Sequence, residues 1–172
     1  AGPYTGMDDG VLIVAGGANF QDKLPWEGGM KIFYDEIFIL IASATGEYSW
    51  EKRDEKIPFA SAYGGAVETP SGLLCFGGNT TNKCISESWL IDYGPATGGV
   101  EIKPGPELPV PLTNFAFAKV DGSVYVAGGL TELSGASGNH FFRLKMSSND
   151  PSNWTWEALP PWEGKPRAFA VG

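Results

Sequence analysis

Short apolar segments that end in a Gly-Gly doublet recur three times along the chain, at residues 11–17, 73–78 and 124–129. Each segment follows a tight turn with Asp-Gly or Pro-x-Gly chemistry, in which a glycine can take a positive φ angle and close a hairpin. Because the doublets start at Gly16, Gly77 and Gly128, the repeat period is about 50 to 60 residues. The pattern predicts the second strand of a repeated β unit at each of these places.

Other strands are predicted around each doublet. A segment rich in Gly and Ala comes before the turn at 63–67, 115–120 and 167–171, and such small residues suit an inner strand crowded near an axis. Third strands are predicted at 36–41, 87–92 and 140–145, and fourth strands at 50–53, 100–103 and 154–157. Each unit is therefore predicted to be a four-stranded antiparallel meander.

One such sheet cannot bury both of its faces by itself, so units of this kind must stack radially, as the blades of a propeller do. The sequence predicts an all-β chain with about three blades, as a single domain that forms part of a ring. The expected blade units are 1–56, 57–108 and 109–160, and the fourth unit starts at 161–172. A chain that stops within a first-strand pattern is expected to be part of a longer polypeptide.

Composition and charge exclude several classes of protein. The 172 residues include 24 Gly and 13 Pro together with 13% aromatic side chains, which argues against both disorder and a helical bundle. The formal net charge of −8 offers no attraction for phosphate backbones, so nucleic acid is not an expected partner. No apolar run is long enough to span a bilayer, so a membrane is not an expected partner either.

Residues with intrinsic reactivity are few. Cys75 and Cys84 could form a disulfide across a short hairpin, but Cys75 lies in an apolar run and is interpreted more simply as a small core residue. His140 is the only histidine, and it opens a predicted strand, where a half-exposed aromatic ring is common. No spacing of His, Cys and carboxylates matches a metal site, and no phosphate loop or nucleophile motif occurs. No metal or cofactor is predicted.

The repeated features resemble those of kelch repeats. These features are the doublet that ends the second strand, the tryptophan near the fourth strand, and the Leu-Pro pairs at 108–109 and 159–160. This resemblance implies a kelch-type β-propeller, a fold that carries both binding scaffolds and enzymes.

A narrower resemblance comes from the segment after the first doublet. Residues 16–20, followed by Pro-Trp-Glu-Gly-Gly at 25–29 and by Lys31, are similar to a loop of the bacterial N-acetylneuraminate epimerases, which are sialic acid mutarotases. Residues 108–112 look like the opening of the first blade in those enzymes, yet here they follow two other blades. This order resembles the cyclically permuted branch of the family. The family also implies a six-bladed ring, and a further Glu and Arg on a blade with no counterpart in this sequence.

Candidate site residues lie in connections that emerge on one face of a propeller, around the mouth of its central channel. The longest of these is 18–35, which contains Asn19, Glu27 and Lys31. Such a mixture of amide, carboxylate and ammonium groups is typical of sugar recognition. An ordinary capping loop with a solvated Glu27 remains the alternative. The epimerase resemblance implies that Glu27 is the acid/base catalyst and that Lys31 and Asn19 bind substrate.

Three further candidates lie where inner strands are predicted to begin. Arg167 follows Pro166, and its planar guanidinium fork suits the carboxylate of a sialic acid. Tyr63 and Asn114 are assigned to equivalent positions of the other units and can donate hydrogen bonds to the same ligand. The alternatives are a structural arginine bonded to backbone carbonyls, and packing or turn capping for Tyr63 and Asn114.

The resemblance implies a sialic acid mutarotase that interconverts sugar anomers by acid/base ring opening, without a cofactor. The alternative is a non-catalytic kelch module that binds a glycan or a protein. The expected partners are a small sugar and the remaining propeller blades, supplied by a missing chain segment or by a second chain. A periplasmic or secreted bacterial location is expected, with any signal peptide already absent.

Overall fold

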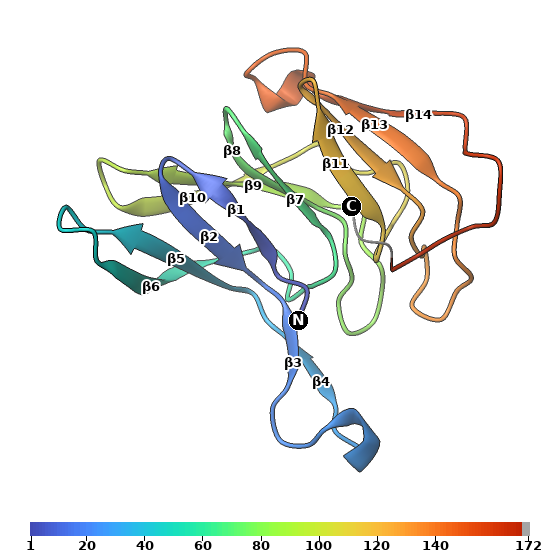
Figure 1. Ribbon diagram of the computed structural model, residues 1–172, viewed down its shortest axis with the longest axis horizontal. Helices are drawn as coiled ribbons and strands as arrows, with labels where there is room; N and C mark the ends of the chain where they lie inside the picture. Colours follow the sequence, from blue (N-terminus) through green and yellow to red (C-terminus); the bar gives the residue numbers. More distant parts are fainter. Residues whose placement is uncertain (170–172) are drawn as a thin grey trace.

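The computed structural model describes residues 1–169 as an all-β molecule with three four-stranded antiparallel sheets (Figure 1). The first sheet, the first blade, contains β1 (Tyr4–Asp8), β2 (Val11–Ala15), β5 (Glu36–Ala42) and β6 (Tyr48–Lys56). The second blade contains β7 (Gly65–Thr69), β8 (Gly72–Phe76), β9 (Ser88–Gly94) and β10 (Gly99–Pro104). The third blade contains β11 (Ala116–Val120), β12 (Ser123–Ala127), β13 (Phe141–Lys145) and β14 (Thr155–Ala158).

The predicted fold class is confirmed: the chain is a partial kelch-type β-propeller whose sheets do not close into a ring. One element was not predicted. A two-stranded hairpin of β3 (Ala18–Phe20) and β4 (Lys31–Phe33) interrupts the first meander between β2 and β5, and it projects away from the blades (Figure 1). A short 3₁₀ helix, η1 (Pro25–Glu27), lies in its turn, and a second, η2 (Pro151–Asn153), precedes β14. Within residues 1–169 no helix is long and apolar enough to cross a membrane.

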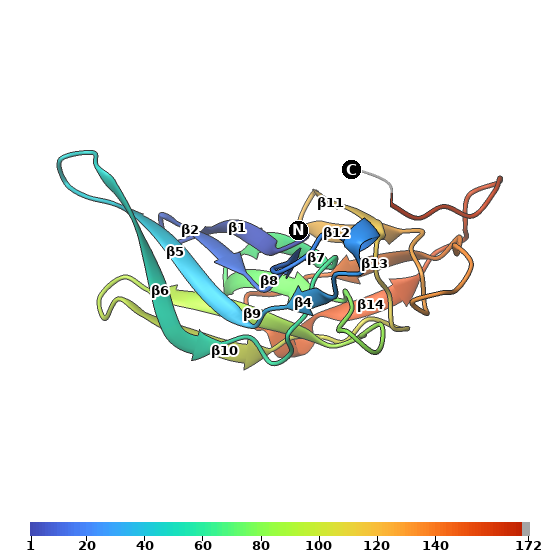
Figure 2. The same cartoon turned by 90° about the horizontal axis from the view of Figure 1, so that it is seen from below.

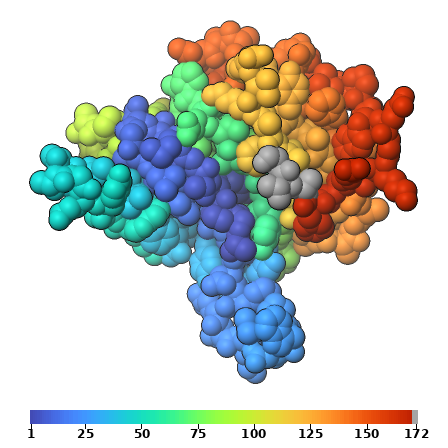
Figure 3. All heavy atoms as spheres, viewed as in Figure 1, coloured from blue at the N-terminus to red at the C-terminus, as the bar shows by residue number. Residues whose placement is uncertain are grey.

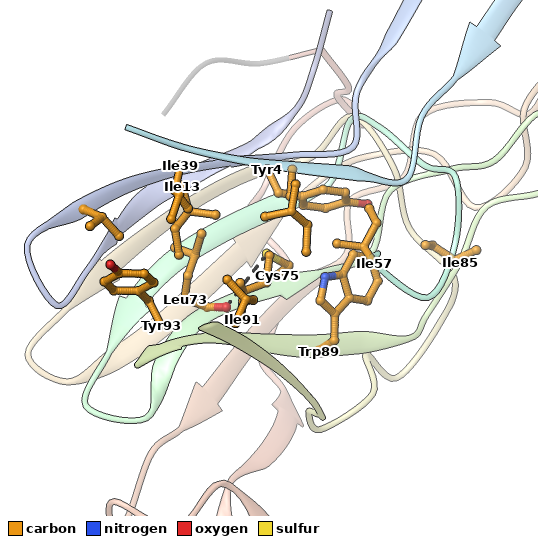
Figure 4. Close-up of a cluster of buried hydrophobic side chains, with 14 residues drawn as sticks. Tyr4, Ile13, Ile39, Ile57, Leu73, Cys75, Ile85, Trp89, Ile91 and Tyr93 are labelled. Atoms are coloured by element: carbon orange, nitrogen blue, oxygen red, sulfur yellow. Dashed lines mark hydrogen bonds between the residues drawn. The ribbon is translucent and has the colours of Figure 1, made fainter. Parts of the chain in front are cut away.

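The blades pack face to face through two buried clusters, and Figure 2 shows the outer strands β6 and β10 lying next to each other. The first cluster joins the first and second blades: Ile13 and Ile39 point toward Ile91 in Figure 4. The second cluster joins the second and third blades and centres on Phe76. Period-two alternation therefore gives β8 two buried faces, one for each neighbouring blade. Cys75 belongs to the first cluster, and both cysteines are free and buried.

The Gly-Gly doublets connect neighbouring blades. Gly77 N–H donates to Glu87 O at the start of the third strand of its own blade (3.1 Å), and Gly78 N–H donates to Leu112 O in the lead-in to the next blade (2.8 Å). Both glycines have positive φ angles, of 60° and 100°. A Cβ atom on Gly77 would lie 2.7 Å from Leu112 O, closer than real Cβ contacts. The doublet is therefore required by the close approach of two backbones.

The predicted inner strand at 167–171 differs from the structure. Arg167, Ala168 and Phe169 are not in a strand, and residues 170 and 171 lie outside the described residues. The other inner strands start later than predicted, at Gly65 and Ala116. Tyr63 and Asn114 precede them with positive φ angles, which a strand does not accommodate. The proposed division into units at 56, 108 and 160 stays a prediction.

Asp8, at the end of β1, gives a prediction about pH. Burial raises the pKa of its carboxyl group, the hydrogen bond from Tyr93 N–H opposes this, and the neighbouring Asp9, Asp92 and Glu68 raise it further. The folded state therefore binds the Asp8 proton more tightly than the unfolded state. The contribution of Asp8 to the stability of the folded state falls as pH rises through the raised pKa. We expect Asp8→Asn to raise the melting temperature slightly at pH 7 and to leave it unchanged near pH 3. Calorimetry at both pH values checks this, and a melting temperature lowered at pH 7 would contradict it.

Candidate functional site at the mouth of the channel

A cavity of about 280 Å³ opens where the lead-ins to the second and third blades meet the base of the hairpin. It is close to the size range of small-molecule pockets. Its lining combines apolar side chains with one ammonium, one phenol, one hydroxyl and two amide groups: Lys31, Phe33, Tyr63, Asn79, Thr113, Asn114, Leu130, Leu133 and Phe169. Three of the six predicted site residues, Lys31, Tyr63 and Asn114, are thus brought together in this mouth cavity.

Lys31 reaches the cavity from the hairpin. Alternation along β4 places Lys31 and Phe33 on the same side, and both line the cavity. Lys31 Nζ donates to Tyr63 Oη over 2.9 Å, and the Phe33 ring meets the Tyr63 ring edge to face. Among the described residues no carboxylate lies within 4.0 Å of Lys31 Nζ. Its positive charge is therefore available to an anionic ligand.

The polar wall of the cavity is a short hydrogen-bond chain. Thr113 Oγ1 lies 2.9 Å from Asn79 Oδ1, to which it donates, and it accepts from Asn114 Nδ2 over 3.2 Å. Asn79 and Thr113 are both buried, so the amides are held in fixed orientations by their partners. Sequence reasoning missed both residues. The available signals were that Asn79 directly follows a doublet and that Thr113 directly precedes Asn114.

Tyr63 and Asn114 occupy equivalent positions in a ladder of backbone hydrogen bonds that joins the lead-ins of successive blades. Tyr63 N–H donates to Gly2 O, Asn114 N–H to Tyr63 O, and Phe169 N–H to Asn114 O, over 2.9, 3.0 and 2.8 Å. All four residues have positive φ angles. The residue equivalent to Tyr63 and Asn114 is therefore Phe169, which corrects the assignment of this position to Arg167.

Arg167 instead corresponds to Ser61 and Leu112. The carbonyl of each of these residues accepts the N–H of the second doublet glycine of the preceding blade, and Gly129 N–H donates to Arg167 O over 2.8 Å. The backbone of Arg167 thus joins the end of the chain to the third blade. Its side chain is exposed and is not among those that line the mouth cavity.

Glu27 and Asn19 lie elsewhere on the hairpin. Glu27 ends η1 in the projecting turn, is exposed, and accepts the Leu24 N–H at its Oε2 over 3.1 Å. Asn19 pairs with Ile32 across the hairpin and lines a different hollow, against the first blade. Neither residue lines the mouth cavity. Catalysis by Glu27 and substrate binding by Asn19 and Arg167 stay predictions.

No arrangement of three or more His, Cys, Asp or Glu side chains within residues 1–169 could hold a metal ion. The mouth cavity itself contains no Asp or Glu among its lining residues. Its chemistry is therefore that of one cation with neutral hydrogen-bonding groups and aromatic or aliphatic walls. This arrangement suits a small polar ligand with one negative charge and several hydroxyl groups.

Comparisons with known proteins agree with the fold and the resemblance. No family model matches the chain. The N-acetylneuraminate epimerase of Vibrio cholerae serotype O1 is 34% identical over 107 residues, covering 56% of this chain and 26% of that protein. The solved structure of YjhT matches with a TM-score of 0.71 at 16% identity, covering 95% of this chain and 52% of that one.

The chain therefore has the fold of YjhT and resembles N-acetylneuraminate epimerases in sequence, as predicted. It spans about a quarter of the length of the curated relative and about half of the solved structure.

Proposed function

We propose that this chain contributes part of the substrate site of a sialic acid mutarotase, an enzyme of the isomerase class that acts in carbohydrate metabolism on free N-acetylneuraminate. The mouth cavity is the observation that carries the proposal, because it holds an ammonium group that has no carboxylate partner among the described residues and lies beside amides and a phenol. Similarity to an epimerase of that sugar supports the choice of ligand.

The chemistry requires two proton transfers. A base removes the proton of the anomeric hydroxyl group, the bond between the anomeric carbon and the ring oxygen breaks, and an acid protonates the ring oxygen. The open chain then closes on the other face of the carbonyl group, and no cofactor is consumed. In this proposal Lys31 holds the sugar carboxylate, Asn79 and Asn114 bind hydroxyl groups, and Tyr63 donates a hydrogen bond.

The remaining parts of the enzyme are proposed to come from further blades, in a missing segment of the chain or in a second chain. They would include the carboxylate that the cavity lacks, unless the hairpin turn brings Glu27 over the ligand. We propose a periplasmic or secreted bacterial location for the complete protein.

One observation favours a second candidate function. Because no carboxylate lines the mouth cavity, its described lining suits the binding of a sugar acid better than proton transfer by a carboxylate. The alternative is therefore a kelch module that binds the same anionic glycan, or a protein that carries it, without turnover.

Nuclear magnetic resonance distinguishes the two functions. For a mutarotase, exchange between the anomers of N-acetylneuraminate, measured by saturation transfer, is expected to be faster with the full-length protein than without it. A binding module would broaden or shift the ligand signals and leave the exchange rate unchanged. If the protein neither shifts the signals nor changes the rate, the sugar proposal is wrong.

A further inference from the structure

Tyr63 carries the hydroxyl group that lies next to Lys31 in the mouth cavity. Lys31 Nζ donates to Tyr63 Oη over 2.9 Å, so this bond leaves the phenolic hydrogen unused. Within residues 1–169 Tyr63 Oη has no other hydrogen-bond partner. The phenol can therefore donate its hydrogen to a ligand while it accepts from the ammonium group.

The Tyr63 ring is held in place by its neighbours. A Cβ atom on Gly2 would lie 2.5 Å from Tyr63 Cδ1, so the ring packs directly on the backbone of Gly2. The ring also meets that of Phe33 edge to face, with centroids 6.4 Å apart. Tyr63 O accepts from Thr113 Oγ1 over 3.2 Å and from Asn114 N–H over 3.0 Å. The phenol therefore has a fixed position, as efficient proton transfer requires.

Lys31 reaches the phenol from the hairpin, which stands out from the blades as a knob in Figure 3. Lys31 Nζ lies 4.8 Å from the centroid of the Tyr63 ring and 5.5 Å from that of Phe20, its partner across the hairpin. Two aromatic rings thus hold the ammonium group. If the phenol gives up its proton, the negative charge develops on the oxygen that already accepts from Lys31, and the ammonium group stabilises it.

The chemistry of N-acetylneuraminate brings this phenol to the reacting atoms. The carboxylate, the anomeric hydroxyl group and the ring oxygen of that sugar are all bonded to its anomeric carbon. An ammonium group has three N–H donors, so Lys31 keeps two for the sugar carboxylate besides the one given to Tyr63. A carboxylate held by these donors brings the ring oxygen within hydrogen-bonding reach of the Tyr63 hydroxyl group.

We propose that Tyr63 is the general acid of ring opening, for sugar acids whose carboxylate is on the anomeric carbon; this inference rests on the proposed function. The phenolic proton moves to the ring oxygen as the bond between that oxygen and the anomeric carbon breaks. The proton of the anomeric hydroxyl group moves to a separate base, for which Glu27 stays the prediction, and an open-chain keto acid results.

Ring closure restores both protons. The new hydroxyl group attacks the other face of the carbonyl group and returns its proton to the phenolate of Tyr63. The carbonyl oxygen recovers the proton from the base and becomes the anomeric hydroxyl group again. The step therefore consumes no oxidant, reductant or cofactor, and Tyr63 ends as a phenol.

Tyr63→Phe in the full-length protein tests the acid, because it removes the hydroxyl group and keeps the ring and the backbone ladder. We expect anomer exchange at saturating N-acetylneuraminate to slow about 10²-fold or more, while the dissociation constant rises less than about tenfold. Tyr34→Phe is the matched control, since its phenol lines the hollow against the first blade, and it should exchange as the parent protein does. Equal rates for Tyr63→Phe and the parent protein at saturation would overturn the proposal.

Lys31→Met gives a second test that does not depend on a variant of Tyr63. Besides weakening binding, it removes the ammonium group next to the phenolate, so exchange at saturating sugar should also slow, about tenfold or more. A variant that exchanges at the parent rate once it is saturated would overturn the stabilisation of Tyr63 by Lys31.

The parent protein separates this proposal from the proposed function. If the unaltered full-length protein does not speed anomer exchange, the proposed mutarotase is wrong, and the assignment of its acid is wrong with it. If the unaltered protein speeds exchange and Tyr63→Phe speeds it equally, the mutarotase stands and only the assignment of Tyr63 is wrong.

Discussion

Replacing Phe76 with alanine is expected to lower the free energy of unfolding by about 4 kcal/mol, as a buried Phe to Ala change does when the cavity cannot collapse. The Phe76 side chain is fully buried at the contact between the second and third blades. Its ring centroid lies 5.7 Å from that of Phe115 and 5.6 Å from that of Phe117. The loss should appear as a lower midpoint of guanidinium denaturation with an unchanged slope.

An exposed aromatic residue provides the control. Trp26 in the hairpin turn is 77% exposed, so Trp26→Ala is expected to change the unfolding free energy by less than about 0.5 kcal/mol. A comparable loss in both variants would mean that blade packing does not decide the stability of the molecule. A small loss for Phe76→Ala alone would mean that the two blades separate easily.

The core between the blades could be predicted because it depends on patterns within single strands. Residues 73–76 contain no polar side chain, a pattern typical of a strand that is buried on both faces, and alternation places Leu74 and Phe76 on one face and Leu73 and Cys75 on the other. The structure also explains the glycine that opens the inner strand β7. A Cβ atom on Gly65 would lie 2.4 Å from the Phe76 ring. The doublets marked the end of the second strand in every blade.

The candidate site was less predictable because its positions share a backbone conformation and not a residue type. The ladder uses Gly2, Tyr63, Asn114 and Phe169, which are four different residue types. A positive φ angle at tyrosine or phenylalanine is imposed by the ladder contacts and is invisible in local propensity. For this reason the last member was placed at Arg167, two residues too early.

The hairpin was missed for a related reason. Its strands are three residues each, too short for alternation to be distinguished from a polar loop. Once the pairing of Phe20 with Lys31 is known, the two sides of the hairpin follow directly. Sequence reasoning could therefore select Lys31 as a site residue, but it could not separate Lys31 from Glu27, which lies in the turn.

Replacing Lys31 with methionine is expected to raise the dissociation constant for N-acetylneuraminate about 30-fold, because a charge-assisted hydrogen bond of about 2 kcal/mol is lost. Methionine retains the length of the apolar stem. Titration calorimetry measures the change, with the carboxamide of the same sugar as the neutral comparison ligand. Equal losses for the acid and the carboxamide would contradict a role for Lys31 in binding the carboxylate. Lys23→Met, on the same hairpin but outside the mouth cavity, is expected to bind both ligands as the parent protein does.

Glu27→Gln separates catalysis from binding on the same hairpin. If Glu27 is the acid/base catalyst, the variant should slow anomer exchange about 10²-fold while the dissociation constant stays unchanged, since an amide cannot transfer the proton. The Leu24 N–H can still be accepted by the glutamine carbonyl, so the turn should keep its shape. An exchange rate equal to that of the parent protein would instead leave Glu27 as the cap of a solvated turn. In the proposed mutarotase, the proton transfers would then belong to a group other than Glu27.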